Sequence, residues 1–121
     1  MITIDLYRNH KGEITGFRSQ GHAGDAPAGE SVICAWVSAA TQMALVGLEQ
    51  QLKYPVDYQV DQKKGVLQVT LQRTPDIKTQ TLLGSMETVL YQLAEQCPQD
   101  VRIREHGGEM NVYTYSAVTC T

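Results

Sequence analysis

The chain has 121 residues, a length typical of one domain, and 42% hydrophobic with 19% charged residues is the composition of an ordinary globular protein. Lys and Arg total 10 and Asp and Glu total 13, so the net charge of −3 argues against a polycationic surface and direct nucleic-acid binding. The first residues have neither a basic start nor a long apolar run, so we expect no signal peptide. Without export, we expect a cytoplasmic location and free thiols. No linker, repeat or low-complexity tract divides the chain, so we expect a single domain over 1–121.

The first half of the chain predicts a hairpin followed by a long helix. Apolar residues alternate along 2–8, and a turn after it lets 14–20 return as the second strand. A Gly-rich loop over 21–30 follows. Ser31 is a good helix cap, and a helix is expected from there to about Lys53, before Pro55 stops it.

The uncharged segment 31–48 admits two interpretations. It is shorter than the ~20 predominantly apolar residues of a membrane span and contains several polar residues, so we expect no membrane partner and a helix buried on more than one side. Its apolar residues lie nearly all round the helix: Val32, Ile33, Trp36, Val37, Met43, Leu45, Val46 and Leu48. One sheet face cannot cover all of them, which predicts a homodimer.

The second half of the chain predicts a second strand pair and a second helix, followed by two more strands. Strands are expected over 56–60 and 66–71. A helix is expected to open at Thr74-Pro75-Asp76, with Pro75 near its first turn, and to end at Pro98. The predicted core stripe of this helix is Leu82, Met86, Val89, Leu90, Leu93 and Cys97. Two more strands, 101–106 and 110–118, join at Gly107-Gly108. The order ββ-α-ββ-α-ββ predicts an α+β fold with a mainly antiparallel sheet covered by two helices.

The residue pair with the most chemical interest is His22 and Cys34. His22 ends a strand, and Cys34 falls in the first turn of the long helix, where unpaired N–H groups and the helix dipole stabilise a thiolate. A nearby His can take the thiol proton or pair with the thiolate. Spacing alone leaves the ordinary alternative open, because a Cys in an apolar helix is more often a small core residue and a lone His is often structural.

The motif around this pair resembles a known signature. Gly21-His22-Ala23-Gly24, then Cys34-Ala35 and Val37-Ser38-Ala39, is similar to the signature of the ribosomal-processing cysteine protease family, Prp. The similarity extends to about Ile103.

The resemblance implies a homodimeric α+β fold and a catalytic dyad with His22 as base and Cys34 as nucleophile. It implies cleavage of a short N-terminal extension from the precursor of a ribosomal large-subunit protein, with the loop between the two residues gating substrate entry. It places Ser38, Ser31, Gly21 and Gly24 in the site in supporting or substrate-binding roles. No cofactor is implied.

Two residues depart from the family pattern. Ser31 stands where the family usually has Asp, so it can cap the helix but supplies no carboxylate to orient a histidine or bind substrate. Trp36 stands where a small residue is usual, and it could fill a dimer contact or narrow the cleft.

Other functions receive less support from the sequence. The glycines before the helix lack the Gly-Lys-Ser/Thr of a phosphate loop, and the His and Cys residues lack paired metal-ligand spacing, so no metal site is expected. Cys97 is interpreted as core and Cys120 as incidental. Two alternatives to the protease stay open: a non-catalytic dimeric module that binds a ribosomal protein or the ribosome, and a redox-sensing thiol at Cys34.

Overall fold

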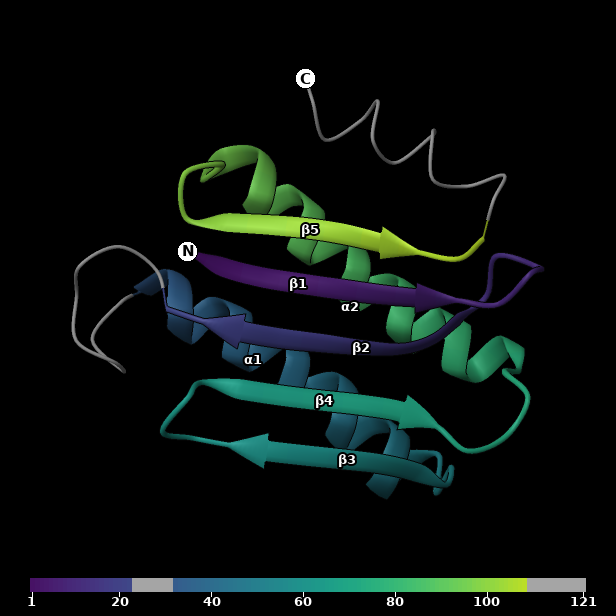
Figure 1. Cartoon of the computed structure of the whole chain (residues 1–121). Coiled ribbons are helices and arrows are strands. Elements are labelled where there is room, and N and C mark those ends of the chain that lie inside the picture. The colour runs from purple at the N-terminus through teal and green to yellow at the C-terminus, as the bar shows by residue number, and fades with distance from the viewer. Residues whose placement is uncertain (23–31, 109–121) are drawn as a thin grey trace.

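The structure is a computed structural model that describes residues 1–22 and 32–108. Its elements in chain order are β1 (Ile2–Arg8), β2 (Ile14–Gly21), α1 (Val32–Val46), the π-helical turn η1 (Gly47–Gln51), β3 (Val56–Asp61), β4 (Val66–Leu71), α2 (Ile77–Gln96) and β5 (Val101–His106). One sheet contains all five strands in the order β3-β4-β2-β1-β5, and both helices lie on the same face of it (Figure 1).

The sheet is mixed but mostly antiparallel. Strands β1 and β2, β2 and β4, and β3 and β4 pair antiparallel, whereas β5 pairs parallel with β1. The predicted α+β class, the mainly antiparallel sheet and the two helices are therefore confirmed. Within the described residues the order is ββ-α-ββ-α-β, with five strands rather than six, and the sixth strand predicted over 110–118 lies outside the described residues.

The last described strand pairs with a partner that the sequence did not indicate. Residues 101–106 were expected to pair with the segment that follows them, yet β5 pairs with β1, with Ile2 opposite Val101 and Tyr7 opposite His106. The physical reason is the crossover made by α2, whose 20 residues carry the chain from β4 past β2 and β1 to the far edge of the sheet. This crossover covers the sheet with an apolar helix face.

The first helix ends close to the predicted Lys53, but its last part is not regular α-helix. The α-helix runs to Val46, and the π-helical turn η1 continues it to Gln51. At Gly47 a Cβ atom would lie 2.6 Å from Cδ2 of Leu82 in α2, so the missing side chain permits the close approach of the two helices. The Tyr54 amide then donates to the Leu48 carbonyl oxygen at 2.8 Å and closes the turn.

The helix α1 buries only one face within the single chain. The buried residues are Val37, Thr41 and Ala44, continued by Leu48 in η1. The opposite face leaves apolar side chains accessible: Val32 78%, Trp36 47%, Met43 68% and Val46 44%. The sheet and α2 thus cover one side of α1, and the burial of its other apolar side chains by a second copy stays a prediction; we refer to Val32, Trp36, Met43 and Val46 as the exposed α1 face.

The length and composition of Val32–Gln51, with a mean hydropathy of 1.5, would suffice for a membrane span. Core helices of soluble proteins pass the same test, which makes it weak evidence. Here the buried side of α1 contributes Val37 and Ala44 to the same core as the sheet and α2.

The second helix opens at the predicted segment, with Pro75 just before the cap. Asp76 is the N-cap and accepts from the Thr79 amide at 2.8 Å, while the Thr79 hydroxyl accepts from the Asp76 amide at 3.0 Å in a capping box.

The buried stripe of this helix confirms part of the predicted core. It consists of Thr79, Leu83, Met86, Glu87, Leu90, Tyr91 and Leu93, so Met86, Leu90 and Leu93 are confirmed. The other predicted members are only partly buried: Leu82, Val89 and Cys97.

Candidate active site

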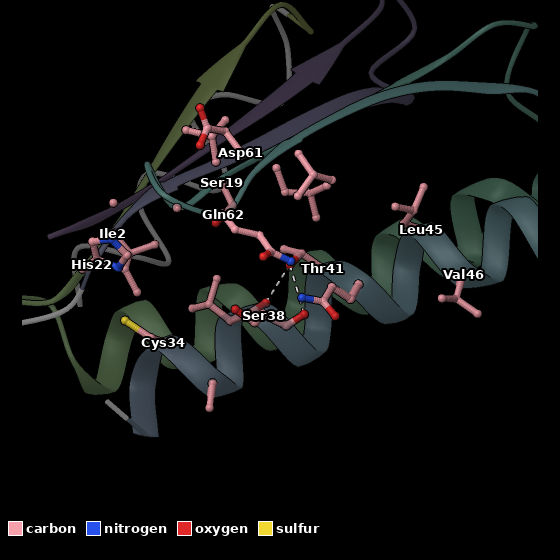
Figure 2. A pocket seen from close by; sticks show the side chains of 18 residues that line it. Ile2, Ser19, His22, Cys34, Ser38, Thr41, Leu45, Val46, Asp61 and Gln62 are labelled. Carbon is pink, nitrogen blue, oxygen red and sulfur yellow. Dashed lines mark hydrogen bonds between the residues drawn. The ribbon is translucent and has the colours of Figure 1, made fainter. Parts of the chain in front are cut away.

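The end of β2 and the first turn of α1 meet at a cavity of about 500 Å³. His22 follows β2, Cys34 is the third residue of α1, and both line this cavity. Figure 2 shows the Cys34 sulfur directed from the helix toward the side of the cavity where His22 lies. The fold thus brings together the two residues that the sequence singled out, although they belong to different elements.

The backbone at His22 is fixed by the neighbouring strand. Gly21 has a φ of +100°, and a Cβ atom there would lie 2.3 Å from the Met1 carbonyl oxygen, so only glycine fits. The Met1 ammonium donates to the His22 carbonyl oxygen at 2.6 Å. The missing side chain of Gly21 thus permits the close approach of the Met1 backbone to the residue before His22; the predicted supporting role of Gly21 stays a prediction.

The thiol lies where a helix presents unpaired N–H groups. Cys34 is half-buried, is in no disulfide and sits in the first turn of α1. Ser38, one turn later, lines the same cavity, as its spacing predicts. Thr41 also lines the cavity, and its hydroxyl donates to the Val37 carbonyl oxygen at 2.9 Å.

The turn between β3 and β4 forms the wall facing α1. Asp61, Gln62 and Gly65 line the cavity from this turn, and Figure 2 shows Gln62 extending from it toward α1. Farther along the cavity the lining includes apolar side chains: Leu45, Val60, Leu67 and Val46, which also belongs to the exposed α1 face. The cavity thus combines a thiol and an imidazole with polar and apolar walls, as small-molecule and peptide sites commonly do.

Two of the predicted site residues, Gly24 and Ser31, lie outside the described residues. The wall residues from the β3–β4 turn were missed, because nothing in their local sequence relates them to His22; only the pairing of β4 with β2 brings them there. Among the described residues no group of three His, Cys, Asp or Glu side chains could hold a metal ion.

Two polar clusters lie outside the cavity. On the sheet face away from the helices, Asp5 accepts hydrogen bonds from Arg104 at 2.8 Å and pairs with His106 at 2.7 Å. Burial alone would raise the pKa of Asp5, but the Arg104 and His106 hydrogen bonds outweigh it and lower that pKa below its ordinary value.

On the opposite face Arg8 pairs with Glu87 and Glu105, and the Tyr91 hydroxyl donates to Glu105. Burial, with the Glu105 hydrogen bond, raises the pKa of Tyr91. Neither cluster lines the cavity, so both read as structural links between β1, β5 and α2.

Comparison with known proteins agrees with this geometry. The family model described as "Cysteine protease Prp" matches residues 1–102, most of the chain. This chain belongs to the Prp family. It is therefore a cysteine protease, a hydrolase.

Two relatives match this chain over nearly their whole length, which supports the family assignment. It is 26% identical to the ribosomal processing cysteine protease Prp of Staphylococcus aureus over 106 residues, 85% of this chain and 97% of that protein. A solved structure of a Streptococcus mutans protein is 27% identical, with a TM-score of 0.77, over 88% of this chain and 95% of the other.

The fold also matches the S. aureus Prp structure solved with a covalently linked product peptide. The TM-score is 0.80 at 24% identity, over 87% of this chain and 99% of that one. A second S. aureus structure, solved with a substrate peptide, has a TM-score of 0.78 at 23% identity over the same shares of the two chains.

Proposed function

We propose that this chain is a cysteine endopeptidase that removes a short N-terminal extension from the precursor of a ribosomal large-subunit protein, with Cys34 as nucleophile and His22 as base. The observation that carries the proposal is the cavity that Cys34 and His22 line from two separate elements, in a chain of the Prp family. The name of the S. aureus relative supplies the substrate class.

The chemistry follows from the two side chains. His22 accepts the Cys34 proton, and the thiolate sulfur attacks the scissile carbonyl carbon to form a tetrahedral intermediate. N–H groups of the first turn of α1 stabilise its oxyanion. As the C–N bond breaks, His22 returns the proton to the leaving amine and a thioester remains. His22 then takes a proton from water, whose oxygen attacks the thioester carbon. As the C–S bond breaks, His22 returns this proton to the sulfur and regenerates the thiol, and the product acid releases its own proton to solvent as the carboxylate.

The proposal includes a homodimer assembled through the exposed α1 face. Its residues, with Ala39 between them, follow a spacing of four and three, the spacing that lets one helix pack along another. All of them are accessible in the single chain. A second copy packed there would remove these apolar side chains from water.

The proposal also places the enzyme in the cytoplasm. The described cysteines, Cys34 and Cys97, are in no disulfide, which agrees with a reducing compartment such as the cytoplasm.

The direct test is incubation with a precursor that carries its N-terminal extension, read by mass spectrometry under reducing conditions. Wild-type protein should shorten the precursor. Cys34→Ser should bind it without cleaving, because the oxygen nucleophile keeps the shape but lacks the reactive thiolate. His22→Ala should slow cleavage by ~10²–10⁴-fold, the usual contribution of general acid–base catalysis.

Cys97→Ser is the matched control. Cys97 is a free thiol at the end of α2 that packs against the core and does not line the cavity, so its replacement should leave cleavage unchanged. A wild-type protein that binds the precursor and never shortens it would refute the proposal and favour the non-catalytic binding module.

A further inference from the structure

We infer that Gly65, in the β3–β4 turn, is a positioning residue for the His22 imidazole; the inference rests on the proposed function of His22. A Cβ atom at Gly65 would lie 2.9 Å from Cε1 and 3.2 Å from Nε2 of His22. The backbone of residue 65 therefore lies directly against the edge of the ring. No side chain other than hydrogen fits there without moving the imidazole.

The sheet register explains why these two residues meet. The β2–β4 pairing runs from Gly16 opposite Thr70 to Ser19 opposite Leu67. Continued by two residues, the same register places Gly21 opposite Gly65. The contact agrees with this, because the Gly65 Cβ position is 3.1 Å from the Gly21 carbonyl oxygen. The residue after Gly21 is His22, so the β3–β4 turn limits the movement of the His22 side chain on that side.

Hydrogen bonds within the β3–β4 turn hold the backbone at Gly65 in place. Gly65 has a φ of +64°, and its amide donates to the Gln62 carbonyl oxygen at 3.3 Å. The Lys64 amide donates to the Asp61 carboxylate at 3.1 Å. These bonds limit how far residue 65 can retreat, so added volume at this position falls on the His22 ring.

A displaced ring is a poor base. Proton transfer needs a heavy-atom distance of about 2.6–3.2 Å, and a misplacement of about 1 Å can cost roughly 100-fold in rate. Gly65→Ala should therefore lower kcat by roughly 10- to 100-fold. The Michaelis constant should change little, because Gly65 presents no side chain to the substrate.

Two further variants separate ring position from turn strain. Asn tolerates a positive φ far better than Ala but carries the same Cβ atom, so Gly65→Asn relieves the backbone strain and keeps the contact with His22. Gly108→Ala is the matched control: its φ is +60°, and its Cβ atom would lie 3.0 Å from the Arg8 side chain, away from the cavity.

The readouts are precursor cleavage, thermal unfolding and the rate at which iodoacetamide alkylates Cys34 as a function of pH, with His22→Ala as the reference profile. We expect both Gly65 variants to shift the alkylation profile toward that of His22→Ala and to lose kcat. Gly65→Asn should be the more stable of the two. Gly108→Ala should lose stability without a shift in profile.

Wild-type kcat and alkylation in Gly65→Asn, with defects confined to Gly65→Ala, would overturn the inference, because only turn strain would then matter. If Gly65→Ala fails to fold, Gly65→Asn alone decides. The alkylation measurement needs no substrate. Absence of precursor cleavage by the wild type would therefore refute the proposed function, while the alkylation profiles would still decide the role of Gly65.

Discussion

Replacing Met43 by Ala tests the proposed dimer at the centre of the exposed α1 face. Met43 is 68% exposed in the single chain and contributes no buried core contact there. The substitution removes most of the side chain while Ala keeps the helix, so the folding of one chain should be nearly unaffected. Any large effect should fall on the association of two chains.

The magnitude follows from the exposed fraction. Burying a whole Met side chain is worth about 1.5–3 kcal/mol, so the accessible two-thirds of Met43 contributes about 1–2 kcal/mol when a partner covers it. A two-fold dimer contains Met43 twice, which gives about 2–4 kcal/mol of association free energy. At 1.4 kcal/mol per factor of ten, the dissociation constant should rise roughly 30- to 700-fold.

Sedimentation velocity or light scattering over a concentration series measures this constant. Tyr58→Ala is the control, since Tyr58 is also an accessible apolar residue, 45% exposed, but lies on the edge strand β3. Met43→Ala should shift the dimer to monomer at micromolar concentration while Tyr58→Ala should not. A wild-type protein that is already monomeric there, or a Met43→Ala dimer of unchanged affinity, would refute the exposed α1 face as the interface.

Three further changes test other parts of the molecule. Cys34 should be alkylated by iodoacetamide faster than Cys97 at mildly acidic pH, because it lies at a helix start in the cavity; equal labelling by mass spectrometry would contradict an activated thiol. Asp5→Asn should destabilise the protein at pH 7, as measured by urea unfolding. The folded-state pKa of Asp5 is lowered, so its contribution is present above about pH 4 and is lost as the pH falls through that lower pKa. Ser31→Asp, which restores the residue usual in the family, should raise the cleavage rate; an unchanged or lower rate would leave Ser31 as a helix cap.

The strands were predictable because their signals are local. Alternating apolar residues and flanking turn residues predicted 2–8, 66–71 and 101–106 at the bounds that β1, β4 and β5 have. The change from α-helix to π-helix at Gly47 was not predicted in this way. The close approach of Gly47 to Leu82 joins residues on different helices, and no local pattern reports such a contact. The parallel pairing of β5 with β1 depends likewise on the path that α2 takes across the sheet.

The sequence singled out Cys34 and His22, the proposed dyad, but not the β3–β4 turn that lines the cavity beside them. A Cys in the first turn of an uncharged helix has a chemical reason to be noticed, and the resemblance supplied His22 as its partner. In the sequence Gly65 could not be distinguished from any other turn glycine. Its contact with His22 depends on a strand pairing between residues more than forty positions apart. The β3–β4 turn is thus the part of the cavity for which the structure was needed.

The different surroundings of three sides of α1 explain why residues 31–48 carry no charge. One side, with Val37 and Ala44, packs in the core, and a second, with Cys34 and Ser38, lines the cavity. The third is the exposed α1 face, which the proposed dimer would cover. A charged side chain on the first side would be buried without a partner, and on the third it would oppose association. The uncharged run that resembled a membrane span is therefore what a helix needs when core, cleft and partner each occupy one of its sides. Since Trp36 of the exposed α1 face lies only two residues after Cys34, the proposed assembly and the proposed catalysis would share the same first turns of one helix.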